Sequence, residues 1–113
     1  MGCLFCNILE KKVPADVVYE DEHALAFRDI RPVAPTHVLV IPKKHVAAIH
    51  DLAPEHVELM GQTMLVARKV AEQLGLVAGG FRLVINDGDQ AGQTVHHIHV
   101  HVLGGRPMTW PPG

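Results

Sequence analysis

Several features that mark common classes of protein are scarce or missing in this sequence. Aromatic residues make up 4% of its 113 residues. No apolar run approaches the roughly 20 residues that span a bilayer, and no charged segment leads into an apolar one as in a secretory signal. Ten Lys and Arg against twelve Asp and Glu leave a net charge of −2, without a polybasic patch. We therefore expect neither a membrane nor a nucleic acid as a partner.

Cysteine is scarce as well, since Cys3 and Cys6 are the two in the sequence. They lie too close together to staple a fold and are better interpreted as metal or redox ligands in a reducing compartment. This predicts a cytoplasmic protein. Hydrophobic residues at 48% and charged residues at 19% are typical of a globular chain. The length fits a single domain over residues 1–113.

Periodicity predicts an α+β fold. Apolar and polar alternation bounded by turn residues predicts strands, and an apolar stripe at spacings of three and four after Pro54 predicts one main helix. We expect that stripe to face the core; it comprises Val57, Met60, Met64, Ala67, Ala71 and Leu74. A short helix is expected over residues 4–10, and strands over residues 17–20, 24–28, 37–41, 81–86 and 95–103. Together these predict an antiparallel sheet of five strands, with the main helix on one face.

The segment 95–103 carries three of the nine histidines. On a strand, His97, His99 and His101 share one face, about 6.6–7 Å apart from one to the next. The apolar residues between them face the other way, towards the helix. His96 also points away from the three and receives no catalytic role. Three aligned imidazoles are hard to explain as packing, so we expect them to carry the chemistry.

Two kinds of chemistry fit three histidines. In a metal site two imidazoles could share one zinc, but the third, four residues along, lies about 13–14 Å from the first, too far for a common ion. The other is covalent catalysis by a neutral imidazole, with its neighbours fixing the tautomer and handling protons. The preceding Gly92-Gln93-Thr94 offers backbone N–H groups and a hydroxyl, suited to a phosphate. The loop favours covalent catalysis.

These residues resemble a known family. The sequence His97-Ile98-His99-Val100-His101-Val102-Leu103 is similar to the signature of the histidine-triad (HIT) superfamily of nucleotide hydrolases and transferases. The similarity extends over essentially the whole chain, and the ending Leu103–Gly113, with its Gly-Gly-Arg and Trp-Pro-Pro-Gly, looks like the Hint branch of purine nucleoside phosphoramidases. The Fhit branch shares Gly92-Gln93-Thr94-Val95 but not that ending. The resemblance implies a HIT-like fold and a homodimer, towards whose partner subunit the tail 104–113 reaches.

The resemblance also implies roles for particular residues. His99 would attack the α-phosphorus of an AMP or GMP phosphoramidate, expel the amine and form a nucleotidyl-histidine that water hydrolyses. His101 and Gly92-Gln93-Thr94 would bind phosphoryl oxygens, His97 would support the site and His37 would order it. Asp29 would accept hydrogen bonds from the ribose. The remaining nucleotide contacts would be made by Leu4, Phe5, Phe27, Ile30, Asn86 and, near the partner's active site, Trp110.

A structural zinc is implied by the same resemblance. Zinc-binding bacterial members carry a similar cysteine pair, so Cys3, Cys6, His45 and His97 would form one closed site per chain. No organic cofactor is implied. Three alternatives stay open at this point: a dinucleoside polyphosphate hydrolase, a nucleotidyl transferase, and a non-catalytic nucleotide-binding or scaffold protein.

Overall fold

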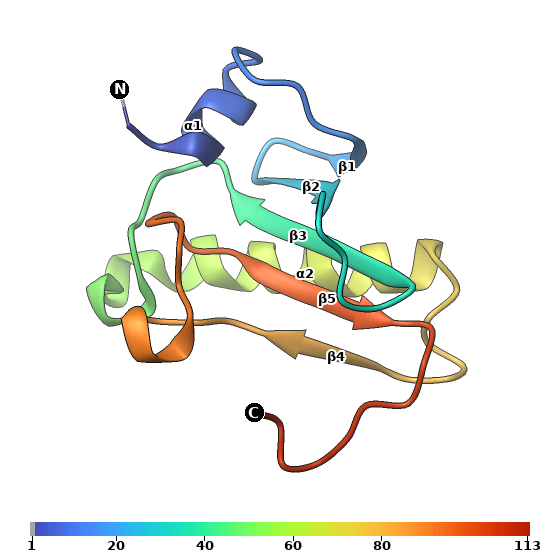
Figure 1. Cartoon of the computed structure of the whole chain (residues 1–113). Coiled ribbons are helices and arrows are strands. Elements are labelled where there is room, and N and C mark those ends of the chain that lie inside the picture. The colour runs from blue at the N-terminus through green and yellow to red at the C-terminus, as the bar shows by residue number, and fades with distance from the viewer. Residues whose placement is uncertain (1) are drawn as a thin grey trace.

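Five antiparallel strands form one open sheet in the order β1-β2-β3-β5-β4, in a computed structural model that describes residues 2–113 (Figure 1). In chain order the helices and strands are α1 (Leu4–Leu9), β1 (Val17–Glu20), β2 (Ala24–Arg28), β3 (Thr36–Pro42), α2 (Val57–Gln73), β4 (Phe81–Val84) and β5 (Val100–Gly104). Short 3-10 helices cover Ile49–Asp51, Pro54–His56 and Asp89–Ala91. This confirms the predicted α+β fold with one main helix and a short N-terminal helix. None of the helices within residues 2–113 is long and apolar enough to cross a bilayer.

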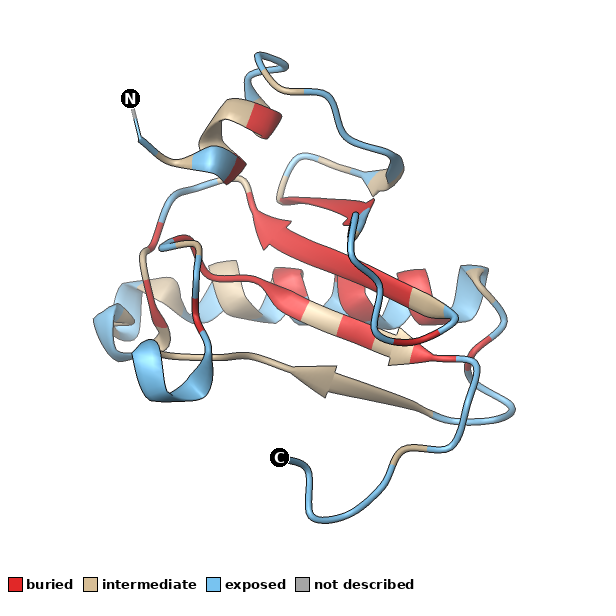
Figure 2. Ribbon diagram, in the orientation of Figure 1, coloured by how far each residue is buried: buried red, intermediate tan, exposed pale blue. Residues whose placement is uncertain are grey.

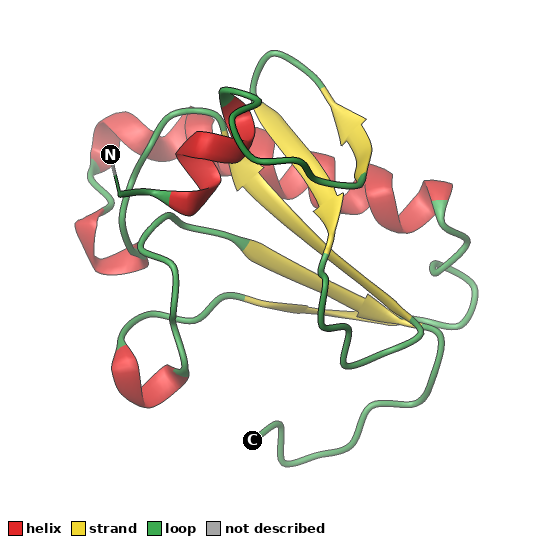
Figure 3. Cartoon of the chain, turned by 45° about the horizontal axis from the view of Figure 1, so that its top comes forward, coloured by secondary structure: helices red, strands yellow, loops and turns green. Residues whose placement is uncertain are grey.

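The two helices cover opposite faces of the sheet (Figure 3). Side chains alternate between the faces along β2 and β3, so neighbouring residues join different cores. The core beneath α2 takes Ala24, Ala26, Val38 and Val40 from these strands, with Val100 and Val102 from β5. The core beneath α1 takes Leu25, Phe27, Leu39 and Ile41, with Phe5 and Ile8 from the helix itself. Because α1 is short, it covers only part of its face.

The buried side of α2 differs from the predicted stripe. Val57 is 75% exposed and Met64 is 38% exposed, although both were expected in the core. Ala67 and Ala71 are buried and Leu74 packs against the core, as predicted, and the helix also buries Thr63, Val66 and Val70. The prediction was wrong for Val57 and Met64, because apolar residues flank Ala67 and Ala71 on both sides and the spacing fits two neighbouring faces. The hydroxyl of Thr63 donates to the carbonyl of Leu59 at 2.8 Å, which satisfies this buried polar group.

The last strand is shorter than predicted. We expected a strand over residues 95–103, but β5 begins only at Val100. The residues just before β5 lie outside the sheet, where the Ile98 N–H donates to the carbonyl of Val46 in the segment after β3. Likewise β4 ends at Val84 rather than Asn86. Beyond β5 the tail is mostly exposed (Figure 2).

Candidate functional site

A cavity of about 390 Å³ opens on the α1 face of the sheet, where the short helix leaves the strands uncovered. Strand pairing sets Phe27 of β2 opposite Leu39 of β3, and Leu39 opposite His101 of β5. These three side chains therefore line the cavity from adjacent strands. Of the predicted site residues, the cavity brings together Leu4, Phe5, Phe27, Asp29, Ile30, Thr94, His99 and His101.

His99 is held in one tautomer. Its Nδ1 lies 2.8 Å from the carbonyl oxygen of His97, which can only accept, so Nδ1 carries the proton. The Nε2 atom then holds a lone pair, and no described residue forms a hydrogen bond with it. The Phe5 ring packs edge-on against the imidazole, with ring centroids 5.0 Å apart. Burial lowers the pKa of His99, so the ring is neutral at pH 7.

His101 is held in the opposite tautomer by a chain of hydrogen bonds. The Val33 N–H donates to His37 Nδ1 at 3.1 Å, so the proton of His37 is on Nε2. That Nε2 lies 2.9 Å from His101 Nδ1 and donates to it, which leaves the His101 proton on Nε2. This Nε2–H is buried without a partner among residues 2–113. Burial and the neighbouring His99 and His37 lower the pKa of His101 to about 4. His101 is therefore a neutral donor that lacks an acceptor.

Asp29 adds a carboxylate to this chain. One of its oxygens accepts the N–H of Arg31 at 2.7 Å, and the other lies 3.4 Å from Nε2 of His37. Asp29, His37 and His101 thus offer three atoms close enough for a metal ion. They do not suit one, because the His37 Nε2 carries a proton and is a donor rather than a ligand. The three residues therefore form a chain of polar contacts rather than a metal site.

The ring of His97 points away from the cavity, into a second cluster with Cys3, Cys6 and His45. Its Nδ1 lies 3.4 Å from Cys3 Sγ, 3.7 Å from Cys6 Sγ and 3.2 Å from His45 Nδ1. Cys6 Sγ lies 3.4 Å from His45 Nδ1. Zinc bonds of 2.0–2.3 Å place tetrahedral ligands about 3.3–3.8 Å apart, so the spacing fits zinc. His97 lies on the α1 side of the sheet like His99 and His101, since its ring packs edge-on against Phe5 with centroids 5.9 Å apart, but it faces the cysteines rather than the cavity.

Two features of this cluster match a metal site in their chemistry. The Nε2–H of His97 donates to the carbonyl of Pro42 at 2.8 Å, which leaves the Nδ1 lone pair facing the thiols. Burial and the adjacent Cys3 raise the pKa of Cys6 to about 11, and a bound cation reverses such a shift by favouring the thiolate. The two residues between the cysteines, Leu4 and Phe5, line the cavity that His99 and His101 face.

Four predicted nucleotide contacts do not line the cavity: Asn86, Gly92, Gln93 and Trp110. Gly92 adopts φ +93°, which suits glycine, and ends the turn that leads to Thr94. The Gln93 side chain is buried away from the cavity. Trp110 is 80% exposed, near the guanidinium of Arg82.

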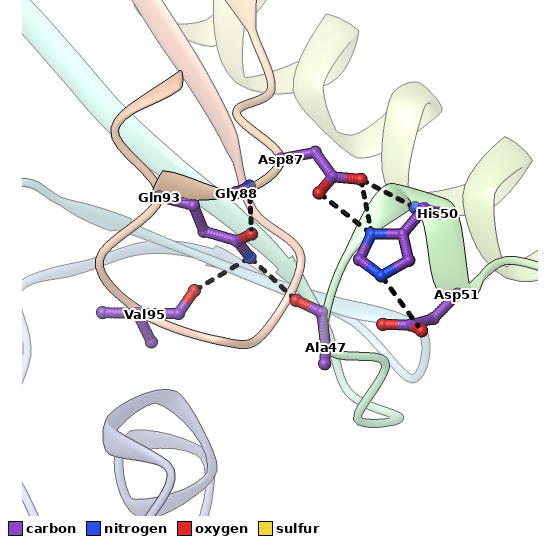
Figure 4. Close-up of polar contacts among 7 residues, drawn as sticks. All are labelled: Ala47, His50, Asp51, Asp87, Gly88, Gln93 and Val95. Carbon is purple, nitrogen blue, oxygen red and sulfur yellow. Dashed lines mark hydrogen bonds and ion pairs between the residues drawn. The ribbon is translucent and has the colours of Figure 1, made fainter. Parts of the chain in front are cut away.

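Other residues at the site were missed by the sequence interpretation. Arg28 and Arg31 line the cavity beside Asp29, and two cations on either side of an acidic residue directly after Phe27 were an available signal. The pair His50 and Asp87 joins the segment after β3 to the loop before Thr94, with the His50 Nδ1 2.9 Å from the carboxylate (Figure 4). No spacing in the sequence indicates that contact, since its partners are 37 residues apart.

The site is therefore a cavity on an antiparallel sheet, and two neutral imidazoles of fixed tautomer face it. Comparison with known proteins adds the family, because the HIT domain family matches residues 10–108. The chain therefore belongs to the HIT family.

Individual relatives cover nearly the whole chain. A 14 kDa zinc-binding protein of Zea mays is 52% identical over 112 residues, which cover 97% of this chain and 87% of the maize protein. A HIT family hydrolase from Legionella pneumophila superimposes with a TM-score of 0.97 at 54% identity, covering 99% of this chain and 100% of that structure. A histidine triad protein from Clostridium difficile gives a TM-score of 0.91 at 39% identity, covering 95% and 93%.

Proposed function

We propose that this protein is a nucleotide-binding hydrolase that cleaves the P–N bond of purine nucleoside 5′-phosphoramidates through a nucleotidyl-histidine on His99. The observation that carries the proposal is the His99 tautomer: Nδ1 is bonded to the His97 carbonyl at 2.8 Å, and Nε2 is free at the cavity. A neutral imidazole of this kind is a nucleophile near pH 7. The similarity to the hydrolase from Legionella pneumophila supports hydrolysis.

The reaction takes two balanced steps. The Nε2 lone pair of His99 attacks the α-phosphorus, and the bond from phosphorus to the amine nitrogen breaks as that nitrogen takes a proton from solvent. Water then attacks the same phosphorus and returns one proton to solvent, which releases a nucleoside monophosphate and restores the neutral imidazole of His99. The unbonded Nε2–H of His101 is suited to a phosphoryl oxygen whose negative charge grows during the attack. Thr94 faces the same cavity and adds a hydroxyl.

The nucleoside would occupy the apolar part of the cavity. Phe5 and Phe27 meet edge to face with centroids 5.5 Å apart, and both are buried. Leu4 and Ile30 are exposed at 45% and 92%, as expected for side chains that a purine would cover on binding. The carboxylate of Asp29 can accept from the ribose hydroxyls.

Mass spectrometry after rapid quenching tests the nucleophile. With an adenosine phosphoramidate we expect an adenylyl group on the peptide that contains His99. The His99→Ala variant should lose turnover by several orders of magnitude and form no adduct. His96→Ala is the matched control, because His96 is exposed and has no role in the reaction. An unmodified His99 under single-turnover conditions contradicts the covalent mechanism, as does near-normal turnover by His99→Ala.

We further propose that Cys3, Cys6, His45 and His97 hold one structural zinc. Their donor atoms all lie within 4.8 Å of one another, and a site whose four ligands all come from the protein is closed and therefore structural. The zinc-binding protein of Zea mays, at 52% identity, supports this metal. When bound, zinc would keep both thiols deprotonated and crosslink α1 to the segments that carry His45 and His97.

Metal analysis and thermal unfolding test the zinc site. Protein purified without chelators should contain about one zinc per chain, and chelation should lower its melting temperature. His45→Ala should lose the metal, whereas His23→Ala, a histidine outside the cluster, should retain it. A metal-free preparation together with a Cys3→Ser variant of unchanged stability would exclude the site.

A further inference from the structure

We infer that Gln93 is a positioning residue: it fixes the loop 88–95 so that Thr94 faces the catalytic cavity, and it does not bind phosphate itself. The inference rests on the proposed function, because it takes the reaction from there. The Gln93 side chain is 5% exposed. Figure 4 shows it turned towards the backbone of Ala47 and Val95, residues of two different segments.

The amide of Gln93 has no donor left for a ligand. Its Nε2 lies 2.8 Å from the carbonyl of Ala47 and 3.2 Å from that of Val95. Its Oε1 accepts the N–H of Gly88 at 2.9 Å. A primary amide has two N–H donors, and both are engaged here. Phosphoryl oxygens require donors, so a contact from Gln93 would break a buried hydrogen bond to backbone, which is costly.

The same loop leaves Thr94 free for a phosphate. The Gly92 N–H donates to the Asp89 carbonyl at 3.1 Å, and the Gln93 N–H to the Gly88 carbonyl at 3.0 Å. In the part of the chain that the structure describes, the Thr94 N–H forms no such bond, and Thr94 lines the cavity. Gln93 and Thr94 are consecutive residues that face in different directions. Gln93 faces the segment after β3, and Thr94 faces the cavity.

Two attachments hold this loop to the segment 46–51, and Gln93 is the buried one. At the other attachment, the His50 N–H and ring bond to the Asp87 carboxylate at 2.8 and 2.9 Å. The His50 side chain is 72% exposed, and exposed pairs contribute little. Fixing Thr94 therefore depends mainly on Gln93, whose bonds are shielded from water.

Amide hydrogen exchange in the nucleotide-free protein tests the inference directly. Gln93→Met keeps the length of the side chain but removes its polar atoms. We expect the Gly88 amide to exchange at least tenfold faster, with β3 and β5 unchanged, since a general loss of stability would affect all three. The matched control is Gln90→Met, because Gln90 is exposed in the same loop and forms no hydrogen bond through its side chain among residues 2–113. The control should exchange as the wild type does.

Kinetics and binding supply the second readout. In Gln93→Met we expect kcat for an adenosine phosphoramidate to fall tenfold to about a hundredfold, because small displacements of a catalytic group have effects of this size. The dissociation constant of adenosine, which lacks a phosphate, should stay within about twofold. In Gln93→Glu the carboxylate still accepts from Gly88, so protection at Gly88 should persist, while the lost donation to Ala47 should lower kcat.

Unchanged Gly88 exchange in Gln93→Met overturns the inference. A loss of AMP affinity without faster exchange at Gly88 would instead identify Gln93 as a phosphate ligand. Should Gln93→Met fail to fold, Gln93→Glu decides, because kcat equal to that of the wild type would overturn the inference. If the wild-type protein cleaves no phosphoramidate, the proposed function fails. Exchange at Gly88, compared with the affinities for adenosine and AMP, then still decides the role of Gln93.

Discussion

Acid should destabilise this protein more than a variant that lacks His101. Burial lowers the pKa of His101 to about 4, whereas in the unfolded chain the imidazole titrates near its ordinary 6.5. Between these values the unfolded state binds more protons than the folded state. The contribution of His101 to stability is therefore complete above about pH 6.5 and is lost as the pH falls towards 4.

The size of the effect follows from the shift. One pKa unit corresponds to about 1.4 kcal/mol, so the whole window corresponds to about 3 kcal/mol. The ring is half-buried, and screening by solvent reduces this to about 1–2 kcal/mol. The loss is steepest between pH 6.5 and pH 4, where the unfolded imidazole is largely protonated and the folded one is not, and about half of it falls above pH 5.

Urea unfolding at pH 7 and pH 5 measures this contribution. Circular dichroism of the 17-residue α2 is the suitable probe, because the single Trp110 is 80% exposed and reports little on burial. His101→Asn keeps an acceptor for the His37 proton but does not titrate. Its loss of stability between the two pH values should be about 1 kcal/mol smaller. Excess zinc is added to both samples, so that any effect of the metal is the same in the two proteins. If the stabilities of the two proteins depend identically on pH, the reasoning is refuted.

Three further predictions concern activity, packing and assembly. The kcat/KM for a phosphoramidate should be flat near neutral pH and fall only well below pH 6.5, because burial lowers the pKa of the nucleophile His99; a fall beginning above pH 6.5 would contradict that environment. Gly104→Ala should destabilise the protein by about 1–3 kcal/mol in urea unfolding, since the added carbon would lie 2.7 Å from the buried Leu76 side chain. The protein should be a homodimer by light scattering at micromolar concentration, and Trp110→Ala should alter selectivity among amine leaving groups; a monomer would exclude this arrangement.

Local patterns predicted most of the sheet. The strands at residues 17–20 and 24–28 have the predicted bounds, because both are short apolar runs and they flank the acidic turn at Asp21 and Glu22. The start of β5 was not predictable in the same way. The chain from Val95 to His99 has the alternation of a strand, but the side chain of His97 and the N–H of Ile98 bond to Pro42 and to Val46. Those long-range bonds leave no trace in the local sequence.

The candidate site, like the sheet, was predictable from the sequence only in part. Residue types and spacing indicated His99 and His101 as the chemical groups, and the cavity contains both. Their tautomers depend on two backbone groups, the carbonyl of His97 and the N–H of Val33, which no residue type reveals. Gln93 shows a further limit: its place before Thr94 suggested a phosphate-binding loop, but the sequence does not indicate that its side chain bonds to the backbone of Gly88, Ala47 and Val95.

The contact between Cys3 and His97, which are 94 positions apart, has a consequence for synthesis on the ribosome. Synthesis proceeds from the N-terminus, so α1 emerges long before the histidines against which it packs. Phe5 cannot pack against His99, and the two thiols cannot contact His97, until those histidines have been synthesised. By then β1, β2 and β3 can already pair. Until then the apolar side of α1 and two reduced thiols stay exposed to solvent, oxidants and competing metal ions. The cavity is thus completed only after the segment that carries Thr94, His99 and His101 has been synthesised, because its lining combines that segment with α1.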